Sequence, residues 1–335
     1  MSNRIERLLS DNEKKRWWLA IGVTTAIAAL QVLFGIYVME EYGMAMFAIT
    51  PFFVGTCAVV IYGYGREITA KQSRVIAFST LLALVLSILI FAIEGLICLF
   101  MAFPILLFFT WLGSYFGLVL LNQLPDKSIN ILLVLIGVIP LMSFIEHGDS
   151  SELTSVVTQI EIAASKEKVW KNVVEFPELN QPSEFIFKTG IAYPINARIE
   201  GSGVGAVRHC NFTTGSFVEP ITVWDEPNLL RFDVVEQPEP MKELSFYDID
   251  APHLHDYFVS KQGQFKLTTL PNGNTLLEGT TWYYHNIKPS MYWQLWSDYI
   301  IHKIHARVLE HIKANSEAED GNPYNSREGL RTCKN

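Results

Sequence analysis

Long apolar runs dominate the first 145 residues of the chain, and alternating polar and apolar positions dominate the rest. The first two runs, Trp17–Met39 and Met44–Tyr62, are each long enough to cross a hydrocarbon core of about 30 Å as a helix. The third run, Val75–Leu121, would be roughly 70 Å long as one helix. It must therefore fold back on itself, and Glu94-Gly95 and Pro104 are the available breaks.

Folding back divides the third run into Val75–Ile93 and Phe103–Leu121, and a fifth apolar run follows at Ile129–Ile145. We therefore predict a polar arm at residues 1–16 and an α-helical membrane domain of about five transmembrane helices at residues 17–145. The first run is too long for the core of a signal peptide, and no small-residue cleavage site follows it. This predicts a retained span and makes the lipid bilayer a partner of the chain.

The distribution of Lys and Arg between short loops predicts the orientation in the membrane. The N-terminal arm carries five such residues and the loop Gly63–Arg74 carries three, whereas Glu40–Gly43 and Glu94–Ala102 carry none. The pattern places the N-terminus in the cytoplasm, and we predict the plasma (inner) membrane as the location. With five spans the soluble domain is extracytoplasmic. A single span plus a re-entrant piece in the third run would make it cytoplasmic instead.

The periodicity changes after a polar linker at residues 146–153. Ser155–Ile162 alternates and is rich in β-branched residues, which predicts a strand, and Ser165 is a suitable N-cap for a helix after it. Further strands are expected at Phe185–Thr189, Ala197–Glu200, Ala206–Thr213, Phe217–Trp224, Leu229–Val235, Phe258–Leu270 and Asn274–His285. The segment Gln237–Asp256, which contains several prolines, is expected to be a long loop or lid.

The last predicted element is a long amphipathic helix, Pro289–Ile312. Its order after the strands predicts an α+β domain at residues 154–315, with a curved antiparallel sheet around this helix and a polar tail at 316–335. Such an arrangement commonly leaves a cavity between the sheet and the helix. Asp298, His302 and His305 share one strip of the helix, because they are spaced i, i+4 and i+7.

Residues 155–314 resemble the START-like superfamily of helix-grip domains (SRPBCC, polyketide cyclase-like). The opening VVTQIEIAASKEKVWKNVVEF resembles the first strand and helix of that family. GVGAVRHCNF and PITVWDEPNLLRFDV resemble its middle hairpins, and the long final helix resembles its closing helix. The resemblance implies an internal apolar pocket and supplies no universal catalytic residues. The chain departs from small soluble members in its membrane region and in the segment Gln237–Asp256.

The strip on the final helix is the candidate catalytic site. Asp298 beside His302 could orient an imidazole as a general base, with His305 next to it. The alternative is that these groups form hydrogen bonds where helix and loop meet and have no further role. We expect no metal and no cofactor, although the loop histidines His253 and His255 would form a metal site with His302 and His305 if the lid folded over the helix.

Several other side chains are candidates for ligand contact. Strand alternation puts Arg208 and Cys210 on one face. An inward Arg208 would need a carboxylate such as Glu219 and could hold an acidic head group, and Cys210 would be either a nucleophile or a small core residue. The aromatic and aliphatic candidates, which serve core packing in the alternative interpretation, are Trp282, Tyr284, Trp296 and Ile301.

Glu94 and the spacing of the cysteines bear on whether the chain handles ions or binds a metal. Glu94 either handles ions or protons within the membrane or lies at a turn in the interface. The four cysteines show no CxxC or CxxH spacing, so a thiolate zinc site is not expected.

The net charge of −8, without a basic stripe, excludes a nucleic-acid surface. The sequence therefore favours a membrane-anchored protein that binds or presents a hydrophobic small molecule such as a lipid, isoprenoid or polyketide-like compound. One alternative is a cyclase or hydrolase that uses the strip on the final helix. The other is a sensor or scaffold that responds to ligand occupancy.

Overall fold

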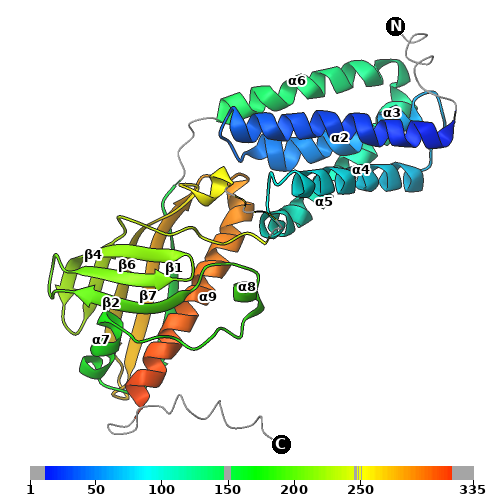
Figure 1. Ribbon diagram of the computed structural model, residues 1–335. Helices are drawn as coiled ribbons and strands as arrows, with labels where there is room; N and C mark the ends of the chain where they lie inside the picture. Colours follow the sequence, from blue (N-terminus) through cyan, green and yellow to red (C-terminus); the bar gives the residue numbers. More distant parts are fainter. Residues whose placement is uncertain (1–11, 147–151, 245–246, 248, 250, 319–335) are drawn as a thin grey trace, which may run out of the picture. The chain divides into compact units, whose positions relative to one another are not determined.

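The computed structural model (Figure 1) describes residues 12–146, 152–244, 247, 249 and 251–318. The chain forms two compact units. The helical unit comprises residues 1–150, 243–257 and 286–293, and the sheet unit comprises residues 151–242, 258–285 and 294–335. Two segments that follow the linker in sequence thus belong to the helical unit.

The helical unit contains five helices, within the described residues, that are long and apolar enough to cross a membrane. Its elements are α2 (Glu13–Tyr37), the π-helical turn η1 (Ala45–Ile49), α3 (Thr50–Gly63), α4 (Ala70–Ile90), α5 (Leu96–Gln123), the short turn η2 (Pro125–Lys127) and α6 (Ser128–Glu146). The chain turns between α4 and α5, where Ala92 has a φ of 53°. This turn contains the first break that the sequence offered, while Pro104 lies inside α5.

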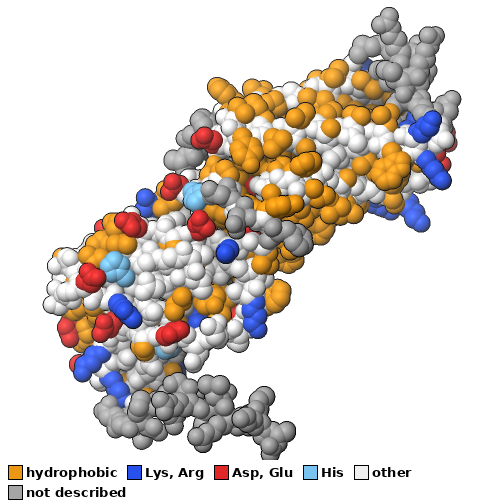
Figure 2. All heavy atoms as spheres, in the orientation of Figure 1, with side chains coloured by type: hydrophobic (Ala, Val, Ile, Leu, Met, Phe, Trp, Pro, Cys, Tyr) orange, Lys and Arg blue, Asp and Glu red, His pale blue; other side chains and the backbone are white. Residues whose placement is uncertain are grey.

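Helix α3 lies at the centre of the unit, with most of its side chains buried. Its backbone meets that of α5 directly: a Cβ on Gly55 would come within 2.3 Å of the Thr110 carbonyl oxygen, and one on Gly113 within 2.1 Å of the Phe52 carbonyl oxygen. Small residues permit this close approach of two apolar helices. On the outside, large hydrophobic side chains cover much of the visible face of the helices (Figure 2).

Two later segments close one end of the helical unit, where the connections 38–44 and 91–95 lie. In the segment 286–293, Lys288 donates its N–H to the Tyr42 carbonyl oxygen at 2.8 Å, and the Trp293 ring packs 4.9 Å from the Phe47 ring. In the segment 243–257, the Leu244 carbonyl oxygen accepts a hydrogen bond from the N–H of Leu96. This second segment contains the short turn η3 (Pro252–Leu254).

The sheet unit is built on one seven-stranded sheet with the order β1-β7-β6-β5-β4-β3-β2, in which every neighbouring pair is antiparallel. The strands are β1 (Thr154–Ile162), β2 (Pro194–Glu200), β3 (Val207–Phe212), β4 (Gly215–Asp225), β5 (Leu229–Asp233), β6 (Phe258–Thr269) and β7 (Thr275–His285). The helices are α7 (Lys166–Val174), α8 (Phe185–Lys188) and α9 (Ser290–Glu317). A curled antiparallel sheet with a long C-terminal helix confirms the predicted α+β architecture of this half.

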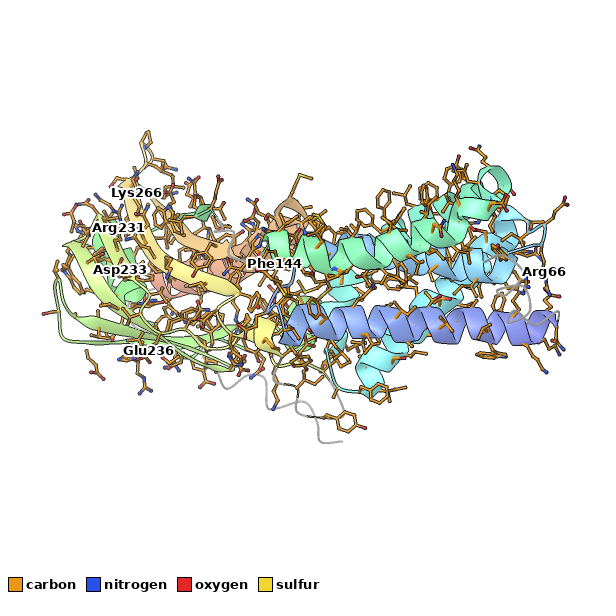
Figure 3. The ribbon with its side chains drawn as sticks, turned by 90° about the horizontal axis from the view of Figure 1, so that it is seen from above. Arg66, Phe144, Arg231, Asp233, Glu236 and Lys266 are labelled. Carbon is orange, nitrogen blue, oxygen red and sulfur yellow. The ribbon has the colours of Figure 1, made fainter. Side chains whose placement is uncertain are left out.

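Alternation along the strands decides which face of the sheet meets α9. Leu230 on β5 and Leu277 on β7 are fully buried and pack in one core with Val308 and Leu309 of α9. Burying each such side chain contributes roughly 1.5–3 kcal/mol. The intervening positions carry polar side chains, such as Arg231, Asp233 and Lys266 on β5 and β6 (Figure 3).

Candidate functional site

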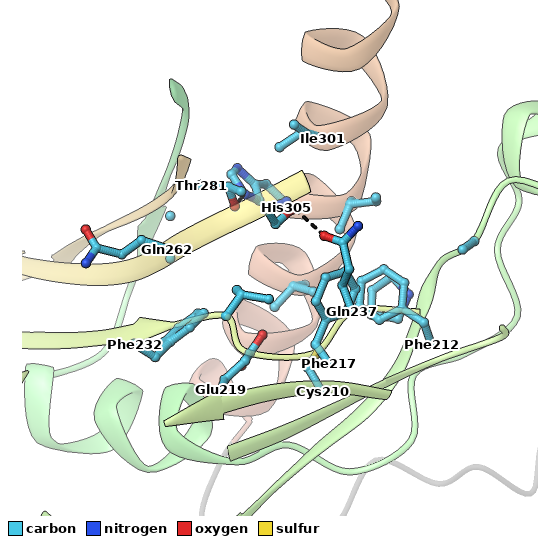
Figure 4. Close-up of a pocket in the computed structure, with 18 of the residues that line it drawn as sticks. Cys210, Phe212, Phe217, Glu219, Phe232, Gln237, Gln262, Thr281, Ile301 and His305 are labelled. Atoms are coloured by element: carbon cyan, nitrogen blue, oxygen red, sulfur yellow. Dashed lines mark hydrogen bonds between the residues drawn. The ribbon is translucent and has the colours of Figure 1, made fainter. Parts of the chain in front are cut away.

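A cavity lies between the inner face of the sheet and α9, and it encloses about 1050 Å³ when its open mouth is counted (Figure 4). This volume includes open solvent at the mouth, so it is an upper bound on the space for a ligand. Its aromatic lining consists of Phe176, Phe212, Phe217, Phe232, Phe258 and Phe265. On the other side α9 contributes Ile300, Ile301, Ile304, Val308 and Leu309.

The buried charges of the cavity form a closed pair. Arg208 on β3 lies directly opposite Glu219 on β4 in the strand register, and the two side chains form a buried salt bridge. Arg208 Nε also donates to the Val174 carbonyl oxygen at 3.2 Å. Burial raises the pKa of Glu219, and the guanidinium opposes that rise. The Glu219 partner suggested by strand alternation is thus the one that Arg208 contacts.

Three aromatic rings surround the same guanidinium. Its central carbon lies 5.4 Å from the centroid of the Phe232 ring and 5.6 Å from those of Phe176 and Phe265. These cation–π distances favour a fixed position for the arginine. The arginine is therefore held in place by the Glu219 carboxylate and by three rings of the lining.

Cys210 lines the cavity two residues after Arg208 on β3. Its side chain is buried, and burial, with the nearby Glu219 carboxylate, raises the pKa of the thiol to about 12. The thiolate is the nucleophilic form of cysteine. At neutral pH Cys210 therefore behaves as a small apolar core residue, which was one of the two interpretations of the sequence.

The histidines of α9 meet at one threonine. Thr158 Oγ1 lies 2.9 Å from His302 Nδ1 and 3.1 Å from His305 Nδ1, and Thr281 Oγ1 lies 2.8 Å from His305 Nε2. His305 lines the cavity, whereas the His302 side chain is exposed. Burial lowers the pKa of His305 to about 4, so this imidazole is neutral at pH 7.

Asp298 takes a different partner from the one that an acid–imidazole pair requires. It accepts a hydrogen bond of 2.6 Å from the Tyr283 hydroxyl. The structure thus brings His302 and His305 together through Thr158 but directs Asp298 to β7. This arrangement gives no support to a general base formed by Asp298 and His302.

Of the four aromatic and aliphatic candidates for ligand contact, one lines the cavity. Ile301 lines the cavity, but Trp282, Tyr284 and Trp296 are not among the lining residues. Trp282 packs with Arg231, and Tyr284 with Lys261, at ring distances of 5.8 and 5.4 Å. Strand alternation explains the positions of Trp282 and Tyr284, because the residue between them, Tyr283, is buried and its two neighbours point to the other face.

The two loop histidines belong to the helical unit rather than to the sheet unit that holds His302 and His305. His255 is exposed. His253 is buried near Glu94 and Cys98, and one donor atom from each of these three residues lies within 4.8 Å of the others. Among the described residues this is the group that could hold a metal ion. The spacing of Glu94 and Cys98, i and i+4 at a predicted break, was the signal available in the sequence.

Gln237, from the predicted loop, was also missed as a cavity residue. Its side-chain amide accepts a hydrogen bond from the N–H of Ser260 at 2.9 Å and donates to the Phe258 carbonyl oxygen. It thereby fixes the loop to β6 beside the cavity. One glutamine in a polar loop carries no pattern that would identify this role.

No family model matches this chain, and no curated protein matches it either. Solved structures similar to the C-terminal half include norcoclaurine synthase from Thalictrum flavum, with 16% identity, a TM-score of 0.32 and coverage of 49% of this chain and 94% of that one. A protein from Nitrosospira multiformis has 17% identity, a TM-score of 0.32 and coverage of 48% and 94%. The Aha1 dimer from Colwellia psychrerythraea has 17% identity, a TM-score of 0.29 and coverage of 50% and 99%. Similarity at this level supports no conclusion about function.

Proposed function

We propose that this chain is a membrane-anchored protein that binds an uncharged hydrophobic small molecule, such as a lipid, isoprenoid or polyketide-like compound, in the cavity of its sheet unit. The observation that carries the proposal is the cavity itself, whose lining is mainly aromatic and aliphatic. Pockets of this kind take most of their affinity from buried apolar area and their orientation from a few polar groups.

The polar groups of the cavity favour a neutral ligand over an acidic one. Arg208 is already paired with Glu219, so an incoming carboxylate would meet another carboxylate beside the guanidinium. Both nitrogens of His305 already contact threonines, but the Thr281 hydroxyl in the lining keeps further hydrogen-bonding capacity and suits a ligand hydroxyl. The acidic head group that an inward Arg208 could have held is therefore replaced by an uncharged one in our proposal.

The five apolar helices support the anchoring part of the proposal, by their length and composition. We propose a plasma (inner) membrane location with the N-terminal arm in the cytoplasm, on the basis of the Lys and Arg distribution. An anchor keeps the cavity close to a bilayer that dissolves hydrophobic compounds, which raises the effective ligand concentration.

The proposal is tested by ligand retention and by filling the cavity. The full chain is purified in detergent, and native mass spectrometry is used to detect bound small molecules. Gly279 on β7 lines the cavity, and a Cβ placed there has only ordinary contacts, 3.7 Å from Leu309 and Phe265. A Gly279→Leu side chain would therefore extend into the open space and should lower the affinity for a fluorescent fatty alcohol at least tenfold.

Glu278→Leu is the matched control, because Glu278 lies on the same strand and pairs with the exposed Gln159 side chain instead of the cavity. This variant should bind the fatty alcohol as the parent does. Preparations without bound small molecules, combined with equal probe binding by the parent and by Gly279→Leu, would refute the proposal.

A further inference from the structure

A compact group of polar side chains lies in the helical unit, apart from the cavity. The turn before α5 places Glu94 just ahead of the helix and Cys98 in its first turn, and η3 supplies His253. Cys98 Sγ lies 2.8 Å from His253 Nε2, and Glu94 Oε2 lies 3.3 Å from His253 Nδ1. Two stretches that are distant in sequence, residues 94–98 and the turn η3, therefore place a thiol, an imidazole and a carboxylate together.

Two of these side chains are buried with unsatisfied atoms. Glu94 is 7% exposed and His253 is 6% exposed. Glu94 Oε1 accepts a hydrogen bond of 2.7 Å from the Tyr42 hydroxyl, but Glu94 Oε2 and His253 Nδ1 face each other without forming one. Leaving buried polar atoms unsatisfied costs about 1–3 kcal/mol each, and more for a charged group. A cation that both atoms bind would remove this cost.

We propose that Glu94, Cys98 and His253 bind a zinc-class divalent cation. Thiolate, imidazole and carboxylate are the three side-chain donor types that Zn²⁺ takes in proteins, and one donor from each residue lies within 4.8 Å of the others. Two ligands at about 2.0–2.1 Å from a tetrahedral ion are separated by roughly 3.3 Å, which matches the distance between Oε2 and Nδ1.

The tyrosine completes the surroundings of the site. The Tyr42 hydroxyl donates to Glu94 Oε1 at 2.7 Å and so holds the carboxylate in place. Hydrogen bonds of this kind orient metal ligands, and their loss commonly costs 10–100-fold in metal affinity. Cys98 Sγ contacts Nε2, the other nitrogen of the His253 ring, so the Cys98 side chain must turn toward Nδ1 for all three donors to face one ion.

A Cys–His–Glu catalytic relay is the competing interpretation of the same residues, and two observations disfavour it. The link between Glu94 and His253 is not a hydrogen bond, although a relay needs the acid to hold the imidazole. The N–H groups of Ile97 and Cys98 at the start of α5 donate to the Glu243 carboxylate at 3.1 and 3.3 Å. A carboxylate thus occupies the donors that would stabilise an oxyanion, and its negative charge adds to the demand for a cation.

Metal content of the full chain tests the proposal. The protein is purified in detergent with a tag that contains no histidines, incubated with Zn²⁺, freed of excess ion and measured by elemental mass spectrometry. We expect about one Zn²⁺ per chain, and a loss of at least tenfold in Cys98→Ser and in His253→Gln. With Co²⁺ in place of Zn²⁺, a thiolate-to-metal absorption band in the near ultraviolet should appear in the parent and vanish in Cys98→Ser.

Cys57→Ser and His255→Gln are the matched controls, since they remove one cysteine and one histidine outside the cluster, and both should retain the metal and the band. The proposal is overturned if the parent binds no more Zn²⁺ than Cys98→Ser does, or if Co²⁺ gives no thiolate band. Rapid alkylation of Cys98 by iodoacetamide in a metal-free parent would favour the relay. Ligand binding in the cavity is measured separately, so failure here leaves the proposed function standing.

Discussion

Glu219 in the sheet unit and Glu94 in the helical unit are both buried carboxylates, with 6% and 7% of their surface exposed. Glu219 faces an arginine that the strand register places directly opposite. Glu94 accepts a hydrogen bond from the Tyr42 hydroxyl. Its other oxygen faces the His253 imidazole without forming a hydrogen bond to it. The first environment is complete within the chain, while the second gains its missing positive charge from a bound ion in our proposal.

The difference shows how local order and tertiary assembly create different kinds of site. Two neighbouring strands fix a pair such as Arg208–Glu219 before any ligand arrives. Donors from separate segments, such as Cys98 and His253, converge only when the helical unit is assembled, and a shared ion can then stabilise that assembly. The following predictions test whether the Arg208–Glu219 pair is stable without a ligand and whether the cluster around Glu94 needs a bound ion.

Removing the arginine should have the largest effect. Arg208→Leu leaves Glu219 buried without its partner, which should lower the free energy of unfolding of the sheet unit by about 3–5 kcal/mol. Hydrogen exchange of the β3 and β4 amides in the full chain measures the loss. The double variant Arg208→Leu/Glu219→Leu should recover most of it, and a double variant as unstable as the single one would contradict the idea of a closed pair.

Supplying the ion should stabilise the helical unit. Free Zn²⁺ at 100 times its dissociation constant adds about 2.7 kcal/mol to the free energy of unfolding. Hydrogen exchange of the segment 251–257 should slow by about a hundredfold with Zn²⁺, and this protection should be lost in Cys98→Ser. If Zn²⁺ slowed hydrogen exchange of the β3 and β4 amides equally, the ion would stabilise the whole chain. That result would contradict a specific dependence of the helical unit on the ion.

Acidification should weaken the sheet unit through His305. The pKa of His305 is about 4 in the folded chain and about 6.5 in an unfolded one. The unfolded state therefore binds more protons between these values, so stability falls as the pH is lowered from about 6.5 to 4, by about 3 kcal/mol. His305→Gln should flatten this slope in pH-dependent urea denaturation, while His302→Gln, at an exposed position, should keep most of it.

Alanine substitutions of two glycines in the cavity lining should give the smallest difference in the free energy of unfolding. A Cβ on Gly263 would lie 2.4 Å from the Phe232 ring, whereas one on Gly279 finds ordinary contacts at 3.7 Å. Gly263→Ala should therefore displace the ring and cost about 1–2 kcal/mol, and Gly279→Ala should change stability by less than about 1 kcal/mol. Denaturant midpoints of the full chain provide the measurement, and equal losses would show that the lining adapts around both positions.

Much of the architecture follows from periodicity alone. The apolar runs and the alternating segments predict the helices and most strands, and β1 matches its predicted range closely. The pairing of Arg208 with Glu219 was also within reach, because side chains of one strand face meet those of the next. Local pattern determines these features, so one sequence suffices to predict them.

The rest of the site depends on contacts that no local pattern records. Asp298 and His302 share a helix strip, yet the partner of Asp298 is Tyr283 on β7. His253 lies in a loop, and its neighbours Glu94 and Cys98 precede it by more than 150 residues. Cys98 matched no zinc motif, because its proposed co-ligand His253 comes from a distant segment and Glu94 is the only one nearby. Predicting such sites requires knowing how the segments pack.

The division of the chain into units has a consequence for biosynthesis. The helical unit includes residues 243–257 and 286–293, so a ribosome that has passed the last apolar helix has not yet made everything this unit contains. Its apolar helices must wait for more than a hundred further residues before Lys288 can reach Tyr42. Translation that stops at residues 146–153 would therefore yield a helical bundle with one end uncovered. Quality-control proteases could then reach the connections 38–44 and 91–95, which the two later segments cover in the finished chain.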